Sequence, residues 1–284
     1  MAKLATSQLI GANFSFQHHP FDHWAAKMRD FGFDRIELWG IAPHLDIGRL
    51  TDEGLTRRRK VLEDNGLGVR CVTPEQVAYP VNIASGDDSY RDASIAQFLR
   101  AAEIAAELAA DYLFLTPGRG YESEPEGRAW ERSAEALTRI VCRAAELGIR
   151  CLLEPLQRAE SNIVTDAAGL ERMLDMIPAQ TVDVVLDTVA MSVAGDNVQD
   201  YLARFGERLA HVHLVDGTPA GHLVWGDGNL PLGELVTDLA AGGYAGTLTF
   251  EPMGNPAYAL DPVLVWQRNM SAIAPFLDGR GRAA

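Results

Sequence analysis

The chain has 284 residues, of which 47% are hydrophobic and 23% charged, a composition typical of a globular protein with a sizeable core. It carries 25 lysines and arginines against 39 aspartates and glutamates, and its net charge of −14 disfavours nucleic acid and anionic membrane surfaces as partners. No apolar run approaches the ~18 residues of a membrane span. The N-terminal segment lacks a signal peptide's apolar core, and the three cysteines form no CxxC motif. We therefore expect a cytoplasmic protein without a disulfide framework or a cysteine zinc site.

Short apolar runs alternate with longer amphipathic segments along the chain. The apolar runs predict eight strands, at residues 9–13, 35–39, 68–73, 112–117, 150–155, 182–187, 209–215 and 247–251. The amphipathic segments predict eight helices, at residues 21–31, 51–65, 89–110, 124–147, 166–177, 198–205, 232–241 and 261–277. Thr51 is expected to cap the second helix, and Gly66 to end it in the left-handed conformation.

The regular alternation of strands and helices predicts a parallel sheet. Eight units of about 35 residues fit an α/β fold of the closed (β/α)8 TIM barrel type. A doubly wound dinucleotide-binding fold normally carries GxGxxG after its first strand, whereas residues 11–15 read GANFS. We therefore expect residues 1–284 to form a single barrel domain, with the last ~6 residues frayed.

Polar residues end four successive predicted strands. They are Glu154, Asp187, His213 and Glu251, each about one strand–helix unit from the next. The carboxyl ends of barrel strands meet at one rim, so these side chains are expected to converge. Three carboxylates that close together do not all ionise without a cation. One imidazole with three carboxylates suits Mn²⁺ or Mg²⁺, or Co²⁺ as a substitute, better than a structural zinc ion. The sequence therefore predicts a divalent metal site.

Two histidines, His211 and His213, lie two residues apart on the seventh predicted strand, so both side chains face the barrel interior. Because His213 lies nearer the rim, we predict that it is the metal ligand. His211 is predicted to be a buried hydrogen-bonding residue.

With these features the chain resembles the xylose-isomerase-like sugar isomerase and epimerase barrels. Within that group it is most similar to the fructoselysine 3-epimerase and ketose 3-epimerase type. The segments that carry the resemblance are IELWG at 36–40 with PH at 43–44, TPE at 73–75 with YP at 79–80, LEPL at 153–156, HVHLVD at 211–216 and GDG at 226–228.

The resemblance implies that Glu154, Asp187, His213 and Glu251 bind one divalent ion, with Mn²⁺ favoured. It also implies that Glu154 and Glu251 flank C3 of a ketose or ketosamine. One carboxylate would remove the C3 proton and the other would return a proton on the opposite face, through a metal-stabilised enediolate. A homo-oligomer, either a dimer or a tetramer, is expected by analogy.

Further residues are predicted to contact the sugar. These substrate-binding candidates are Glu37, Trp39, His44, Glu75, His222 and Trp225. Glu75 would accept a hydrogen bond from a hydroxyl or an ammonium group, and Arg119 is a candidate for a substrate carboxylate or phosphate. For His18 and His19 two interpretations stay open, contact with the substrate and ordinary surface positions.

Two positions differ from the ketose 3-epimerases that act on free sugars. Those enzymes carry a histidine where this chain has Ala190 and an arginine where it has Pro219.

Three other functions stay open at this point. An aldose–ketose or keto-inositol isomerase and a dehydroshikimate-type dehydratase use the same scaffold, and a sugar-binding protein would need no metal quartet. An apurinic-site endonuclease would need more histidines and a basic face.

Overall fold

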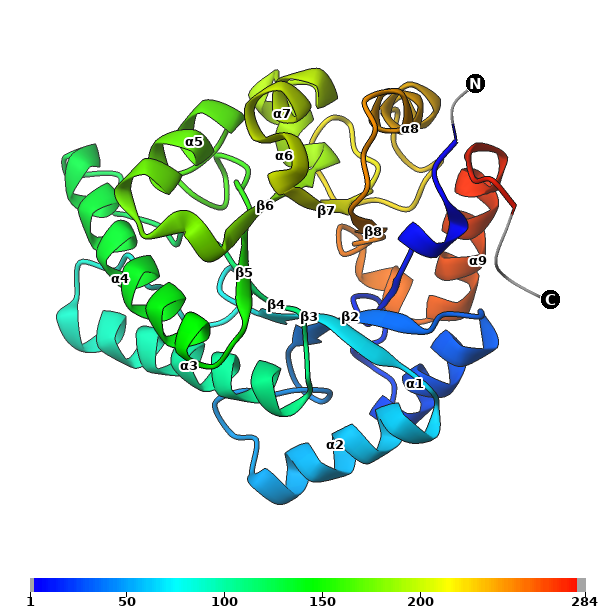
Figure 1. Ribbon diagram of the computed structural model, residues 1–284, viewed down its shortest axis with the longest axis horizontal. Helices are drawn as coiled ribbons and strands as arrows, with labels where there is room; N and C mark the ends of the chain where they lie inside the picture. Colours follow the sequence, from blue (N-terminus) through cyan, green and yellow to red (C-terminus); the bar gives the residue numbers. More distant parts are fainter. Residues whose placement is uncertain (1–2, 280–284) are drawn as a thin grey trace.

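The computed structural model describes residues 3–279, which form a ring of eight parallel strands surrounded by helices (Figure 1). The strands are β1 (Gly11–Ala12), β2 (Arg35–Gly40), β3 (Gly68–Pro74), β4 (Tyr112–Leu115), β5 (Arg150–Leu153), β6 (Val182–Asp187), β7 (Leu209–His213) and β8 (Thr247–Thr249). They lie in sequential order, each parallel to the next. Leu9 bridges Leu248, and this contact nearly closes the ring between β1 and β8. The predicted (β/α)8 TIM barrel is confirmed.

Nine α-helices are present in the part of the chain that the structure describes. They are α1 (Phe21–Asp30), α2 (Asp52–Asp64), α3 (Asp88–Glu107), α4 (Glu126–Glu146), α5 (Ala167–Met176), α6 (Thr188–Ala194), α7 (Val198–Phe205), α8 (Leu232–Ala241) and α9 (Pro262–Ile273). The Thr51 hydroxyl accepts a hydrogen bond from the Gly54 amide, and Gly66 has a φ of +66°, as predicted for the two ends of α2.

The α6 helix was not among the predicted helices. Its seven residues follow β6 directly, so the apolar sequence TVAMSVA lacks the length that a helical period needs to stand out. Asp187, the last residue of β6, also caps this helix by accepting the Ala190 amide at 2.6 Å. The predicted fraying of the C-terminus concerns residues that, from 280 onward, lie outside the described part of the chain.

Side chains on alternate strand positions face opposite sides of the sheet. One set packs between the sheet and the helices and forms the main core. The other set fills the inside of the barrel as a separate small cluster, composed of Cys71, Tyr112, Phe114, Leu152, Val185 and Ala210. This inner cluster lies beneath the polar residues at the strand ends.

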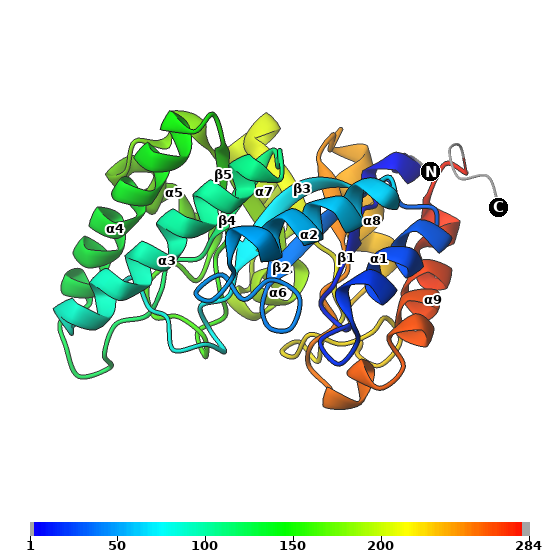
Figure 2. The ribbon, with the colours of Figure 1, turned by 90° about the horizontal axis from the view of Figure 1, so that it is seen from below.

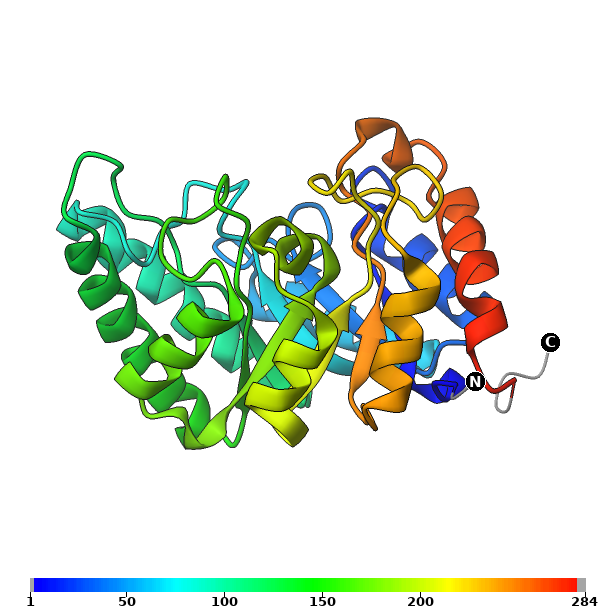
Figure 3. The same ribbon diagram turned by 90° about the horizontal axis from the view of Figure 1, so that it is seen from above.

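The loops that follow the strands gather at one end of the barrel. The segment after β7 and the 3₁₀ helix η4 (Pro256–Ala259) after β8 rise side by side at that end (Figure 3). The two ends of the described chain also meet, because Leu4 pairs with Leu277 in a parallel bridge (Figure 2). Among the described residues, no helix combines the length and the apolarity that a membrane crossing would require.

Candidate metal centre and active site

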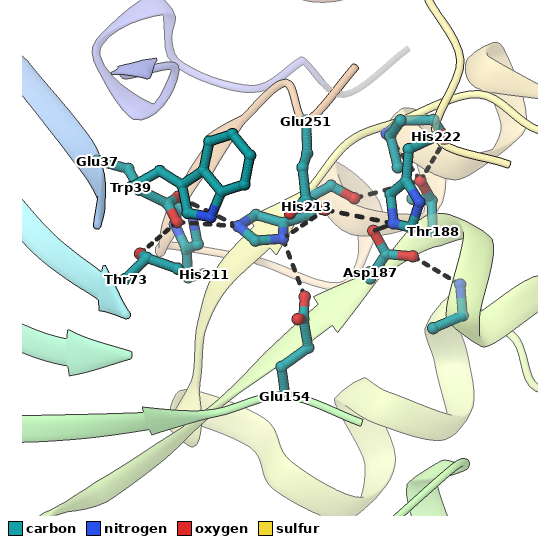
Figure 4. Close-up of polar contacts among 12 residues, drawn as sticks. Glu37, Trp39, Thr73, Glu154, Asp187, Thr188, His211, His213, His222 and Glu251 are labelled. Atoms are coloured by element: carbon teal, nitrogen blue, oxygen red, sulfur yellow. Dashed lines mark hydrogen bonds and ion pairs between the residues drawn. The ribbon is translucent and has the colours of Figure 1, made fainter. Parts of the chain in front are cut away.

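The four predicted ligands converge at the loop-bearing end of the barrel (Figure 4). Glu154 directly follows β5, Asp187 ends β6, His213 ends β7 and Glu251 follows β8. One ligand atom from each residue lies within 4.8 Å of the other three, and all four side chains are buried. The parallel sheet therefore assembles residues from four separate strand–helix units into one compact cluster.

The atoms of this cluster point at one another without forming hydrogen bonds. His213 Nδ1 lies 2.9 Å from Glu154 Oε1 and 3.1 Å from Glu251 Oε2. Yet His213 Nδ1, Glu154 Oε1 and Asp187 Oδ2 are buried without a hydrogen-bond partner among the described residues. Buried polar atoms are nearly always satisfied, so three such atoms around one point need a further partner. Three carboxylates and an imidazole are a fitting donor set for a divalent cation.

Glu37, on β2, lies behind the metal-facing side of His213. Its Oε2 is 3.1 Å from His213 Nε2 and 3.0 Å from His211 Nε2, and its Oε1 accepts the Thr73 hydroxyl at 2.6 Å. A carboxylate can only accept, so Nε2 of His213 carries a proton, and Nδ1 faces the cluster, where its lone pair would bind a cation once that nitrogen is deprotonated. Such a carboxylate–histidine contact orients a metal-binding imidazole.

The charge state of Glu37 follows from its surroundings. Burial alone would raise its pKa, but the charge of His213 and the hydrogen bonds from both imidazoles outweigh it and hold the pKa of Glu37 well below its usual range. The second ring nitrogen of His211, Nδ1, lies 2.8 Å from the Thr247 hydroxyl. His211 is thus fully buried and hydrogen-bonded, and it takes no place in the metal-ligand cluster.

Two aromatic rings fix the plane of the His213 imidazole. Phe114 stacks on it with ring centroids 5.1 Å apart and an interplanar angle of 6°, and Phe14 meets it edge-on at 5.6 Å. These phenylalanines were not among the predicted site residues. Phe114 faces inward on β4, which was the available signal, whereas Phe14 lies in the turn after β1, and neither position identifies the partner ring.

Two of the metal-facing carboxylates, Glu154 and Asp187, have raised pKa values in the protein without its cation. Burial raises the pKa of Glu154 to about 8, and the charges of Glu251 and Asp187 add to this effect against the opposing influence of His213. Burial likewise raises the pKa of Asp187. A cation that replaces bound protons would relieve the repulsion among these groups.

A cavity of about 290 Å³ opens directly onto the cluster, and Glu154, Glu251 and His222 line it. Trp39 and Glu75 form part of its wall, where the Trp39 indole donates to Glu75 Oε2 at 2.8 Å. The second Glu75 oxygen accepts the amides of residues 77 and 78 at 2.6 and 2.7 Å, so the carboxylate is held in place. Among the described residues, no lysine or arginine lines this cavity. Lining residues that sequence reasoning missed are Gln17, Gln76, Phe114, Thr116, Leu156, Glu160 and Met253.

His222 reaches the cluster from the long loop after β7. Its Nε2 lies 3.4 Å from Glu251 Oε2 and 3.7 Å from Asp187 Oδ2. The loop is fixed by Asp216, whose carboxylate accepts four backbone amides at 2.8–3.0 Å, those of residues 217, 226, 228 and 230. The Gly254 amide also donates to the His222 carbonyl at 2.6 Å. The loop that follows the predicted ligand His213 therefore holds a second imidazole over the cluster.

Three predicted substrate contacts lie outside the cavity wall. Glu37 is enclosed beneath His213, as described above. His44 is fully buried, with Nδ1 3.0 Å from the Asn13 side-chain amide and Nε2 2.8 Å from the His19 carbonyl. Trp225 is also buried and donates to the Leu214 carbonyl at 3.0 Å. Hydrogen-bond partners turn the rings of His44 and Trp225 into the protein, and their role in substrate binding stays a prediction.

The three residues whose roles stayed open occupy different places. His18 is exposed, and neither it nor His19 lines the metal-site cavity. His19 Nε2 lies 3.3 Å from the Ala259 carbonyl. Arg119 lines a second cavity that adjoins the first.

Comparisons with known proteins agree with this architecture. The profile of the xylose isomerase-like TIM barrel family matches residues 25–274. The chain is 30% identical to fructoselysine 3-epimerase of Escherichia coli O157:H7 over 237 residues, which cover 83% of this chain and 86% of that protein. It is 28% identical to D-psicose 3-epimerase of Agrobacterium fabrum, over 85% of this chain and 84% of that one.

The solved structure of an L-ribulose 3-epimerase superposes with a TM-score of 0.76 at 24% identity, over 98% of this chain and 95% of the other. At that level of identity the likeness concerns the fold alone. The match to the family profile, by contrast, spans most of the chain, including all four predicted metal ligands. The chain belongs to the xylose isomerase-like TIM barrel family.

Proposed function

We propose that this protein is a divalent-metal-dependent epimerase that inverts C3 of a ketose or a ketosamine. The observation that carries the proposal is the position of two carboxylates. Glu154 and Glu251 approach His213 from two sides, at 2.9 and 3.1 Å from Nδ1, and both line the same cavity (Figure 4). Inversion of one carbon centre requires a group on each face of that carbon, one to remove a proton and one to supply it.

The residues of the cavity divide the work as follows. Either Glu154 or Glu251 takes the proton from C3, and the other delivers a proton to the opposite face of the planar carbon. Trp39 and the fixed oxygens of Glu75 provide the wall against which the sugar lies. A divalent ion held by Glu154, Asp187, His213 and Glu251 supplies Lewis-acid polarisation of the ketose carbonyl, which makes the C3 proton more acidic. Mn²⁺ is the ion that we propose, with Mg²⁺ and Co²⁺ as alternatives for the same ligand set.

Two further observations support the proposal. Two relatives with similar sequences are named as 3-epimerases of fructoselysine and of D-psicose, both compounds with a ketose skeleton. The cavity next to the cluster contains several carboxylates but no lysine or arginine among the described residues, so it disfavours a phosphorylated sugar.

Proton exchange in D₂O tests the proposal directly. The Mn²⁺-loaded protein is incubated with fructose, psicose or fructoselysine, and the products are analysed by NMR. We expect deuterium at C3 together with the C3 epimer, and loss of both in Glu154→Gln and Glu251→Gln. The absence of C3 deuterium with every ketose would refute the proposal. Deuterium at C1 or C2 instead would identify an aldose–ketose isomerase, and a product lighter by one water would identify a dehydratase.

A further inference from the structure

A second cavity of about 200 Å³ adjoins the cavity at the metal-ligand cluster. The two share four lining residues, Gln76, Val77, Leu156 and Glu160. We call the cavity at the metal ligands the inner compartment and the cavity that reaches Arg119 the outer compartment. Because four residues line both of them, the two compartments lie next to each other.

The two compartments differ in charge. Glu75, Glu154, Glu160 and Glu251 line the inner compartment, and Glu160 stands where the two meet. Glu160 is partly buried and held by the Gln157 amide at 3.2 Å, and burial raises the pKa of its carboxyl. A cationic group of a ligand that passes the junction would offset the cost of burying this carboxylate.

The outer compartment contains a guanidinium that the fold holds firmly. The Asn82 side chain accepts the Arg119 amide at 3.0 Å and donates to the Arg119 carbonyl at 2.8 Å. The Arg119 side chain donates to the Ala159 carbonyl at 2.6 Å and to Glu122 at 2.7 Å. Glu122 also binds Arg158 through both of its oxygens, at 2.6 and 2.9 Å. Glu122 thus pairs with two guanidinium groups, and Arg119 brings a positive charge to the outer compartment, which Glu160 also lines.

Apolar side chains also line the outer compartment. Val77 and Tyr90 line the outer compartment although they are 52% and 36% exposed, and Leu156 belongs to the shared wall. Exposed apolar side chains beside a cavity are typical of a surface that a ligand covers. The carboxylate of Glu160, several apolar side chains and the guanidinium of Arg119 therefore all line the outer compartment.

We infer that the outer compartment is a second substrate subsite, which binds the substituent of a ketosamine that ends in a carboxylate. The inference rests on the proposed function. The sugar carbons occupy the inner compartment, the secondary ammonium on C1 lies near Glu160, an alkyl chain crosses the apolar wall, and the terminal carboxylate pairs with Arg119. The substrate class is therefore an amino-acid conjugate of a ketose, and free ketoses use only half of the groove.

Two synthetic ketosamines isolate the contribution of the carboxylate. The Mn²⁺-loaded protein is assayed for C3 exchange with 1-deoxy-1-(pentylamino)fructose and with 1-deoxy-1-(5-carboxypentylamino)fructose, which differ only in the carboxylate. A charge-assisted contact predicts that kcat/KM is about tenfold higher for the carboxylated compound. Arg119→Gln should bring the ratio of the two values close to 1, and Arg119→Lys should restore part of it. Arg158→Gln is the matched control, because Arg158 shares Glu122 but lines neither compartment, and it should keep the wild-type ratio.

Either a wild-type ratio near 1 or a ratio that Arg119→Gln leaves unchanged would overturn the inference. Calorimetry of the carboxylated compound provides a readout that does not depend on turnover. Binding to wild type should be about tenfold tighter than binding to Arg119→Gln. If no compound exchanges at C3 but this difference in binding persists, the proposed reaction fails and the subsite stands. Equal binding would remove the subsite, whatever the reaction.

Discussion

The substitution Glu37→Gln tests whether a carboxylate outside the ligand set controls the metal site. Glu37 accepts hydrogen bonds from Thr73, His211 and His213 and remains ionised within the barrel. Glutamine preserves the shape of the side chain, and its oxygen can still accept from the two imidazoles if its amide group turns toward the Thr73 hydroxyl. His213 then keeps its Nδ1 lone pair for the metal but loses the negative charge behind Nε2.

The expected size of this effect follows from that geometry. Changes in residues that orient metal ligands typically lower metal affinity by about 10- to 100-fold. Because the tautomer of His213 can survive in Glu37→Gln, we expect a loss near the lower end, about tenfold. Glu37→Leu leaves three buried donors unpaired, which costs roughly 1–3 kcal/mol for each, so it should destabilise the fold as well as abolish metal binding.

Isothermal titration of the metal-free protein with Mn²⁺ measures the affinity, and circular dichroism monitors the fold. Thr73→Val is the matched control. It removes one donor to Glu37 without touching either imidazole, so we expect its Mn²⁺ affinity to stay within about threefold of wild type. A Glu37→Gln protein that binds Mn²⁺ as tightly as wild type would refute the reasoning, since the carboxylate would then have no influence on His213.

Three further predictions follow from the site. Asp187→Asn keeps an acceptor for the Ala190 amide but removes a charged ligand, so the variant should still fold. In differential scanning calorimetry, saturating Mn²⁺ should raise its melting temperature by less than the ~5 °C or more expected for wild type. Burial raises the pKa of Glu154 to about 8 in the cation-free protein, so this carboxyl holds a proton at pH 7 that the metal must displace. Mn²⁺ affinity measured by calorimetry should therefore rise from pH 6 to pH 8, and a flat profile would contradict the assignment. Asp216→Asn loses the charge on the acceptor of four loop amides, so kcat/KM should fall about tenfold while Mn²⁺ affinity changes little, and equal losses in both would show that the loop supports the metal ligands themselves.

The metal quartet could be predicted from the sequence because its geometry depends on only two rules. Each of Glu154, Asp187, His213 and Glu251 ends or follows an apolar run, and parallel strands bring their carboxyl ends to one rim. Alternation along β7 turns both His211 and His213 into the barrel. Only His213, which lies nearer the rim, reaches the other predicted ligands.

The surroundings of the quartet could not be read in the same way. Glu37 ends up 3.1 Å from His213 although the two are 176 residues apart, and only the register of the closed barrel sets this contact. His44 lies in a segment that resembles a sugar-binding region, yet a backbone carbonyl and Asn13 occupy its ring nitrogens. For Trp225 the turn of the loop decides the direction of the ring, and loop conformation depends on contacts such as those of Asp216 rather than on periodicity.

The charge of the barrel interior links the metal centre to the choice of substrate. Glu37, Glu154, Asp187 and Glu251 are all buried, so four carboxylates surround His213 within a small volume. With these groups ionised, one divalent cation offsets only half of their charge. An anionic group of a ligand close to the cluster would then be repelled by roughly 3–4 kcal/mol per charge at about 4–6 Å. A cationic nitrogen next to the reacting carbons would be attracted by the same field. In the proposed substrate complex an anionic group is therefore favoured only away from the metal ligands, and Arg119 carries a positive charge in the neighbouring cavity.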